Sequence, residues 1–320
     1  MTTRLRGPIS ALAAVSAFTL ALTSCGGQDA GSSGSGDGEQ LSGEVKVDGS
    51  STVAPLSEAA AAFYAEEQPD VNVTVGTSGT GGGFEKFCNG ETDISDASRP
   101  IKDEEIAACE ANSITYAELI VANDALTVVV NPAVDFVDCL TVEQLSAIWG
   151  PDSTIANWNE VDPSFPDLPL DLYGAGTDSG TFDYFTDAIN GEEGASRTDY
   201  TPSEDDNTTV QGVAGSEGGM GYFGFTYFEE NADTLKALEI DNGEGCVAPS
   251  VETAQDGSYA PLSRPLFVYP SDKAIERPEV LDFVNFYIDN IDDIVTEAQY
   301  VPLTDEQKAT LAEEFEALTG

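Results

Sequence analysis

Hydrophobic positions along the chain follow two spacings, one typical of strands and one typical of helices. Short apolar runs with the length and composition of strands lie at 44–49, 71–76, 125–131 and 264–270. Longer amphipathic segments that predict helices lie at 53–67, 277–290 and 304–320. Another helix is predicted after Thr141, because Gln144 stands three residues later and completes a capping box. This alternation predicts an α/β fold.

The first 24 residues differ from the rest of the chain. Two arginines precede an apolar stretch at 9–22, which is too short for a comfortable membrane span and is typical of a signal peptide. The stretch ends in Leu-Thr-Ser-Cys25, which resembles the lipobox of bacterial lipoproteins. The resemblance implies that residues 1–24 are removed by cleavage before Cys25 and that a lipid is attached to Cys25. An ordinary signal peptide with a chance cysteine is the alternative. Residues 25–42 are rich in Gly and Ser and predict a flexible tether.

Composition narrows the classes of protein that fit. A length of 320 residues favours two domains, and 41% hydrophobic residues indicate a globular chain. The formal net charge of −46 argues against a nucleic-acid partner, because phosphate backbones are bound by clustered Lys and Arg. The chain has no histidine, which excludes His-based catalytic triads and His-containing zinc sites. We therefore expect no metal and no cofactor.

The cysteines beyond the leader predict disulfides. They are Cys88, Cys109, Cys139 and Cys246. An even number in an exported chain indicates two bridges, with three possible connectivities. A zinc site built from all four is disfavoured because no CxxC pair is present.

Three segments combine a strand, a loop of Gly and hydroxyl residues, and a helix start. They are 48–55 (DGSSTVAP), 76–84 (GTSGTGGGF) and 176–182 (GTDSGTF). Free backbone N–H groups and Ser or Thr hydroxyls at a helix N-terminus favour anions. The alternative for each segment alone is a plain N-cap. None matches the nucleotide P-loop pattern.

An arginine supplements these loops as a candidate anion ligand. Arg99 lies in the segment TDISDASRPI (92–101), which reads as a strand followed by a turn. A guanidinium suits a tetrahedral oxyanion because it donates two hydrogen bonds at once. A surface ion pair is the competing interpretation in so acidic a chain.

These motifs, in this order, resemble the PstS-type phosphate-binding lipoproteins of bacterial ABC importers. The resemblance rests on DGSSTVAPLSEAAAAF, GTSGTGGGFEKF, DISDASRPI, YGAGTDSGTFDYF and GGMGYFGFTYF, and it covers about residues 43–320. It implies a two-lobed Venus-flytrap fold, with a mixed sheet flanked by helices in each lobe and a ligand cleft between them. The implied lobe I is 43–124 plus 266–320, and the implied lobe II is 125–265.

The resemblance also implies which residues contact phosphate. Carried over by motif, and with Arg99 as the inferred cation, the contacts are Ser51, Thr52, Ser78, Thr80, Ser98, Arg99, Ser179, Gly180 and Thr181. This chain has Ala175 where better-known members have an arginine, and Ser98 where they have an aspartate. The carboxylate that accepts the phosphate proton must then come from elsewhere. Asp206, with Asn207 beside it, is one candidate, and Asp96 and Asp178 are its rivals.

The implied function is that of an extracytoplasmic binding protein, not an enzyme. It would capture inorganic phosphate, close around it and deliver it to the membrane subunits of an ABC permease, as a monomer held to the membrane by lipid on Cys25. Bridges within a lobe, Cys88–Cys109 and Cys139–Cys246, fit this picture because cross-pairing would oppose hinge closure. The alternatives are another tetrahedral oxyanion (sulfate, molybdate or a phosphonate) and a secreted phosphatase that uses Ser179.

Overall fold

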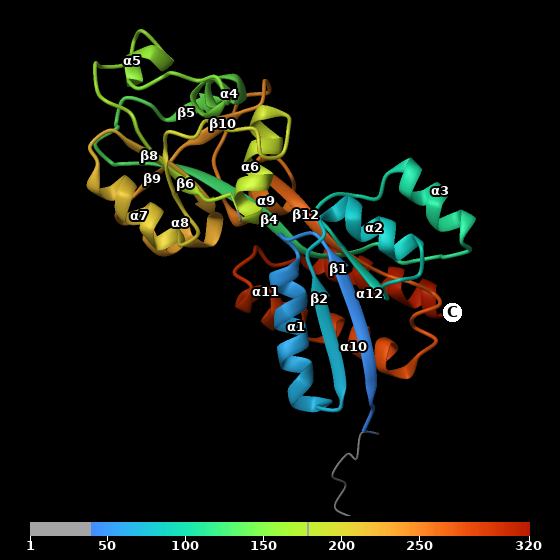
Figure 1. Cartoon of the computed structure of the whole chain (residues 1–320). Coiled ribbons are helices and arrows are strands. Elements are labelled where there is room, and N and C mark those ends of the chain that lie inside the picture. The colour runs from blue at the N-terminus through green and yellow to red at the C-terminus, as the bar shows by residue number, and fades with distance from the viewer. Residues whose placement is uncertain (1–39, 178) are drawn as a thin grey trace, which may run out of the picture. The chain divides into compact units, whose positions relative to one another are not determined.

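The computed structural model describes residues 40–177 and 179–320. The expected signal peptide at 1–24, Cys25, most of the tether at 25–42 and Asp178 lie outside these residues. Strands and helices alternate along the described chain, so the predicted α/β class is confirmed (Figure 1). Within the described residues, no helix combines the length and the apolar character needed to cross a membrane.

One long sheet links most of the strands in the order β2-β1-β3-β12-β4-β8-β6-β7, and β9 pairs with β4 off this path. These strands are β1 (Gly43–Gly49), β2 (Val71–Gly76), β3 (Ile94–Ala97), β4 (Leu119–Val130), β6 (Asp171–Ala175), β7 (Thr201–Ser203), β8 (Gly219–Gly224), β9 (Lys236–Ala237) and β12 (Ser263–Pro270). A small sheet contains β5 (Cys139–Thr141), β10 (Glu239–Asp241) and β11 (Cys246–Val247). The parallel pairs β1–β2 and β6–β8 belong to opposite ends of the long sheet.

The strands β4 and β12 carry the chain between the two halves of the molecule. They pair antiparallel, with Arg264 opposite Asp124 in the register. In Figure 1 they run from the group of elements around β1 and β2 to the group around β6 and β8. Nearly every residue of β4 is buried, as expected for a strand covered on both faces.

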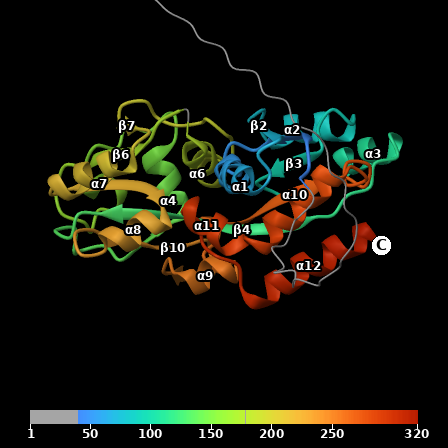
Figure 2. The same cartoon turned by 90° about the horizontal axis from the view of Figure 1, so that it is seen from below.

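Six helices of the described residues accompany the strands of the proposed lobe I: α1 (Ala54–Glu67), α2 (Thr80–Cys88), α3 (Asp103–Ala111), α10 (Pro278–Asp289), α11 (Ile291–Glu297) and α12 (Asp305–Thr319). The main core here combines residues 45–122 with residues 266–315, so both ends of the chain build it. The ring of Tyr64 on α1 packs edge-on against Phe283 on α10 at 5.2 Å. Figure 2 shows these helices around the β4 strand from below.

The other six helices accompany lobe II: α4 (Val142–Trp149), α5 (Trp158–Val161), α6 (Gly180–Asn190), α7 (Asp206–Gly215), α8 (Phe225–Asn231) and α9 (Val251–Gln255). Thr141 caps α4 in the predicted capping box with Gln144. A second large core lies within residues 126–262, where Tyr222 stacks on Phe185 at 3.7 Å. The two largest cores lie on either side of the proposed lobe boundary, which falls inside β4 and β12, and a small cluster of Ala125, Phe225, Ala254 and Val301 spans it.

The two disulfides join the expected cysteines. Cys88 on α2 pairs with Cys109 on α3, and Cys139 on β5 pairs with Cys246 on β11. Both bridges therefore connect neighbouring elements, and neither joins the two proposed lobes. Cys88 and Cys109 are fully buried, whereas Cys246 is exposed.

We predict that mild reduction of the native protein opens the Cys139–Cys246 bridge first. Thiol exchange needs access of the attacking thiolate to a sulfur, and burial of Cys88 and Cys109 denies it. Alkylation under native conditions, followed by peptide mass spectrometry, would report the order of labelling. Labelling of Cys88 or Cys109 at the lower reductant concentration would contradict the prediction.

Candidate functional site

A cleft of about 820 Å³ has walls from both proposed lobes. Lobe I lines it with residues 50–52, residues 78–82, residues 98–100 and Lys102. Lobe II contributes Asp183, Tyr184, Asp187 and Glu193, and the crossing strand β12 contributes Arg264 and Pro265. The cleft therefore gathers two of the three loops that the sequence singles out, together with Arg99.

The second loop brings a helix N-terminus to the cleft. Gly79 precedes α2 with φ at +80°, and no side chain caps the helix. The first N–H groups of a helix have no carbonyl partner inside it. Gly81 and Gly82 line the cleft without side chains to cover these groups. Unpaired N–H groups at a helix start are chemically suited to an anion.

The hydroxyl groups around α2 differ in what they can still donate. Ser78 donates both its backbone N–H and its hydroxyl to Asp48, at 3.0 and 2.5 Å. Thr80 accepts the backbone N–H of Ser98 at 3.2 Å, and the two hydroxyl oxygens lie 3.1 Å apart. In this pair either hydroxyl can donate to the other. A proton of the Thr80–Ser98 pair is therefore available to a ligand, whereas the Ser78 hydroxyl proton is committed to Asp48.

The first loop, at residues 50–52, contributes a hydroxyl held from several sides. The backbone N–H of Thr52 binds the Ser50 hydroxyl at 3.2 Å, and its carbonyl accepts the Tyr300 hydroxyl at 2.7 Å. The Thr52 hydroxyl oxygen accepts a hydrogen bond from Arg264 at 3.1 Å. Ser51 lies beside it in the cleft lining. A fixed Thr52 hydroxyl that already accepts a bond has its proton free for a ligand.

The third loop meets the first at Gly180. A Cβ at this position would lie 2.9 Å from the Thr52 hydroxyl oxygen and 3.2 Å from the Thr52 Cα. Ser179 caps α6 by accepting the N–H of Thr181 at 3.2 Å. Thr181 lines a second cavity of about 110 Å³ rather than the cleft. The three predicted residues of this loop therefore share one helix start but do not share one cavity.

Of the candidate carboxylates, Asp206 and Asp96 lie apart from the cleft lining, and Asp178 lies outside the described residues. Asp206 borders the second cavity, and burial, together with the charges of Asp205 and Glu204, raises its pKa to about 6. Asn207 is exposed and donates to Asp205. Asp96 is fully buried in β3, where it accepts the Ser57 hydroxyl at 2.9 Å and burial raises its pKa to about 7.

Arg99 enters the cleft already paired. Its two terminal nitrogens donate to both oxygens of Glu105 on α3, at 2.9 and 2.8 Å. This hydrogen-bonded pair raises the pKa of Arg99, with burial opposing the shift. The guanidinium stays near the start of α2, since a Cβ on Gly81 would lie 3.9 Å from one of its nitrogens. The sequence offered two interpretations of Arg99, a ligand in the cleft and an ion pair. In the structure Arg99 both lines the cleft and pairs with Glu105.

The sequence reasoning missed Arg264 and its partner Asp124. Arg264 donates from Nε to Asp124 at 3.2 Å, and both side chains are largely buried at the crossing strands. One signal was present, since an arginine inside a segment that otherwise predicts a buried strand needs a partner. The partner itself could not be named, because Asp124 is 140 positions away along the chain.

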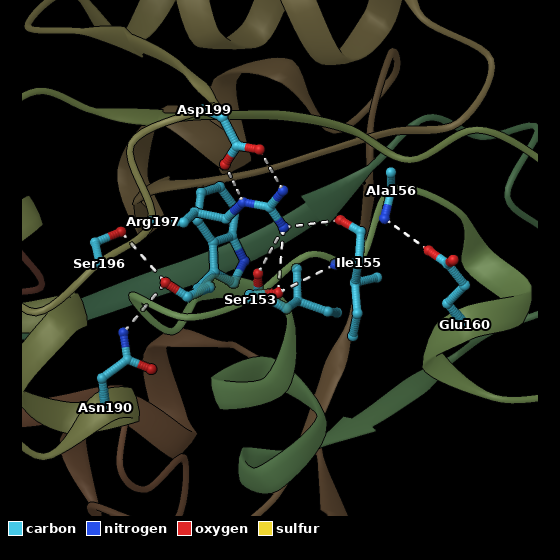
Figure 3. A network of polar contacts seen from close by, with 10 residues as sticks. Ser153, Ile155, Ala156, Glu160, Asn190, Ser196, Arg197 and Asp199 are labelled. Atoms are coloured by element: carbon cyan, nitrogen blue, oxygen red, sulfur yellow. Dashed lines mark hydrogen bonds and ion pairs between the residues drawn. The ribbon is translucent and has the colours of Figure 1, made fainter.

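Another arginine, Arg197, makes its polar contacts within residues 148–199, away from the cleft (Figure 3). It is buried in lobe II, and its guanidinium bonds both oxygens of Asp199 at 2.6 and 2.9 Å. It also donates to the carbonyls of Ile148 and Ile155 and to the Ser153 hydroxyl. Arg197 does not line the cleft, and its network joins the segments around Ile148, Ile155 and Asp199.

The wall from lobe II is acidic. Asp183, in the first turn of α6, is hydrogen-bonded to Glu193, and both line the cleft. Burial, together with the charge of Glu193, raises the pKa of Asp183 to about 6. The folded protein therefore holds the Asp183 proton more tightly than the unfolded chain, and this carboxyl group contributes less stability as the pH rises through 6.

We predict that Asp183→Asn raises the melting temperature above that of the wild type at pH 8, and that this gain shrinks toward pH 4. The amide removes the carboxylate that burial and Glu193 disfavour. Thermal melts of both proteins at pH 4, 6 and 8 would measure the difference. Asp187→Asn, at an exposed position on the same helix, controls for the lower net charge. A gain for Asp183→Asn that does not change with pH would contradict the prediction.

Comparisons with known proteins identify the family. Residues 32–290 match the model of the PBP superfamily domain. The chain is 49% identical over 270 residues to Protein SphX of Synechocystis sp., covering 83% of this chain and 80% of that protein. It is 41% identical to the phosphate-binding protein PstS of Staphylococcus saprophyticus, covering 89% and 86%. The crystal structure of a possible phosphate binding protein from Planctomyces limnophilus superposes with a TM-score of 0.84 at 47% identity, covering 88% of this chain and all of that chain. The chain therefore belongs to the PBP superfamily, as a relative of the PstS phosphate-binding proteins.

Proposed function

We propose that this protein binds inorganic phosphate in the cleft between its lobes and delivers it to an ABC permease. The observation that carries the proposal is the convergence of the first two loops, the uncapped start of α2 and Arg99 on one cleft. Ser51, Thr52, Thr80, Ser98 and Arg99 form the proposed contacts from lobe I. From lobe II, Ser179, Gly180 and Thr181 at the start of α6 complete the site when the lobes close.

The donors available are sufficient for tight binding. Micromolar affinity requires about 8 kcal/mol of net binding free energy. A hydrogen bond to a charged group contributes about 1.5–3 kcal/mol. Several such bonds exceed the requirement and leave a margin for desolvation and for ordering the loops. Because the Ser78 hydroxyl is committed to Asp48, we assign Ser78 to shaping the loop rather than to donating.

The proposed function also implies where the protein acts, which is outside the cytoplasm. The protein would act as a monomer held at the outer face of the membrane by lipid on Cys25, and its closed form would dock on the permease. The cleft of about 820 Å³ is larger than one oxyanion needs, which supports a closing motion on binding.

Two other functions compete with this one. The same cleft could select sulfate, molybdate or a phosphonate, since the loops donate to any tetrahedral oxyanion. A phosphatase using Ser179 is disfavoured, because the Ser179 hydroxyl caps α6 and the chain has no histidine to act as its base. Release of phosphate from a generic phosphate ester would favour the phosphatase.

Calorimetry with phosphate and sulfate tests the proposal directly. The proposal requires a carboxylate at the closed site that accepts the phosphate proton and repels fully ionised sulfate, so we expect micromolar or tighter binding of phosphate and much weaker binding of sulfate. Arg99→Ala should weaken phosphate binding by removing one charged donor. Equal affinity for both anions would contradict the phosphate assignment, and unchanged phosphate affinity in Arg99→Ala would remove Arg99 from the site.

A second prediction concerns the contact between the first and third loops. Gly180→Ala should weaken phosphate binding by about 10-fold or more, because the added methyl group meets backbone atoms of Thr52 at 3.1 and 3.2 Å. Gly215→Ala is the matched control, since a Cβ at that helical position has no neighbour within 4 Å among the described residues. Titrations of both variants would measure the effect. Equal affinities of the two variants would show that the loops do not need this close approach.

A further inference from the structure

The four arginines among the described residues differ in how many of their N–H groups already have a partner. Arg197 donates hydrogen bonds to Asp199 and to neighbouring carbonyls. Arg277 forms ion pairs with Asp93 and Glu279 and donates to the carbonyl of Glu44. Arg99 commits both terminal nitrogens to Glu105. Arg264 alone of the four combines a place in the cleft lining with a terminal nitrogen, Nη1, that has no hydrogen-bond partner among the described residues.

Arg264 is held in a defined orientation by contacts that leave its terminal nitrogens at the cleft. Asp124 accepts from Nε at 3.2 Å, and Nη2 donates to the Thr52 hydroxyl oxygen at 3.1 Å. The guanidinium lies over the ring of Tyr184, with its central carbon 3.4 Å from the ring centroid. Only 18% of the Arg264 side chain is exposed, so its position is fixed by packing as well as by hydrogen bonds.

These contacts come from three different parts of the fold. Thr52 belongs to the first loop of lobe I, Tyr184 belongs to α6 of lobe II, and Asp124 lies opposite Arg264 on the crossing strand β4. Arg264 therefore touches both walls of the cleft from the strands that join them. A ligand bound to it would therefore contact the strands that join the two proposed lobes.

We propose that Arg264 is an anion-binding residue of the cleft, donating from its terminal nitrogens to the oxyanion and ordering the Thr52 hydroxyl toward it. This inference rests on the proposed function, which supplies the oxyanion. By donating to the oxygen of Thr52, Arg264 leaves the hydroxyl proton of Thr52 to point at the ligand. Arg264 thus provides one donor to the ligand directly, its Nη1, and orients a second donor, the Thr52 hydroxyl.

Asp124 acts as a positioning residue for Arg264. Its carboxylate is almost fully buried and does not line the cleft. Burial raises the pKa of Asp124, and the charge of Arg264 opposes that shift. Replacing Arg264 by a neutral residue would strand a buried carboxylate and could unfold the protein. The double variant Arg264→Gln with Asp124→Asn avoids this problem, because it removes both charges together.

The test compares phosphate affinity, by calorimetry, with the melting temperature of the unliganded protein. We expect the double variant to bind phosphate about 10- to 100-fold more weakly than the wild type, the loss of one or two hydrogen bonds to a charged ligand. Arg264→Lys, which keeps the charge but not the fork, should fall between the two. Arg277→Gln removes the same charge outside the cleft and should bind like the wild type.

The outcomes separate the inference from the proposed function. Wild-type affinity in the double variant overturns the role of Arg264, even if its melting temperature falls, because that pattern indicates a structural residue. If the wild type binds sulfate, arsenate or molybdate instead of phosphate, the phosphate assignment fails and the Arg264 comparison is made with that anion. If the wild type binds none of these anions, both proposals are overturned.

Discussion

The pairing of β4 with β12 is the interaction on which the remaining structure depends. These strands join the two ends of the long sheet, and β4 contributes to the large hydrophobic cores on both sides of the proposed lobe boundary, whereas β12 contributes Leu266 and Val268 to the core of the proposed lobe I. At that boundary the apolar pattern is interrupted by Asp124 and Arg264, which face each other across the strands. A buried ion pair adds little net stability compared with an apolar pair. Its presence in this position therefore supports a role in the cleft.

The acidity of the chain does not conflict with a site for anions. Exposed charges more than about 8 Å apart are largely screened at physiological ionic strength. Within the cleft, the ligand would meet the uncapped start of α2, the hydroxyls of Thr52 and Thr80, and the guanidinium groups. The opposite wall is acidic, and burial together with the charge of Glu193 raises the pKa of Asp183 to about 6, so the negative charge on this wall falls as the pH drops through 6. Local geometry thus outweighs net charge.

Much of the fold was predictable because it is encoded locally. The strand at 71–76 and the capping box at Thr141 depend on residues close together in the sequence, and both occur as expected. The candidate site was predictable to the same extent: Ser51, Thr52, Thr80 and Ser98 belong to local loop motifs, and they line one cleft. That Thr181 lines the second cavity was not predictable, because this cavity also includes residues far away in the sequence, such as Asp124 and Tyr300.

The sequence by itself determined the α/β class, the family and the loops that offer backbone N–H groups, since each depends on spacing within a short segment. Only the tertiary structure decided which donors remain free. It committed the Ser78 hydroxyl to Asp48 and one N–H group of each terminal nitrogen of Arg99 to Glu105, and it brought Arg264 to Thr52 across 212 positions of the chain. The physical reason is that a polar group can serve a ligand only with the hydrogen bonds its neighbours have not taken. Those neighbours are set by long-range pairing and packing.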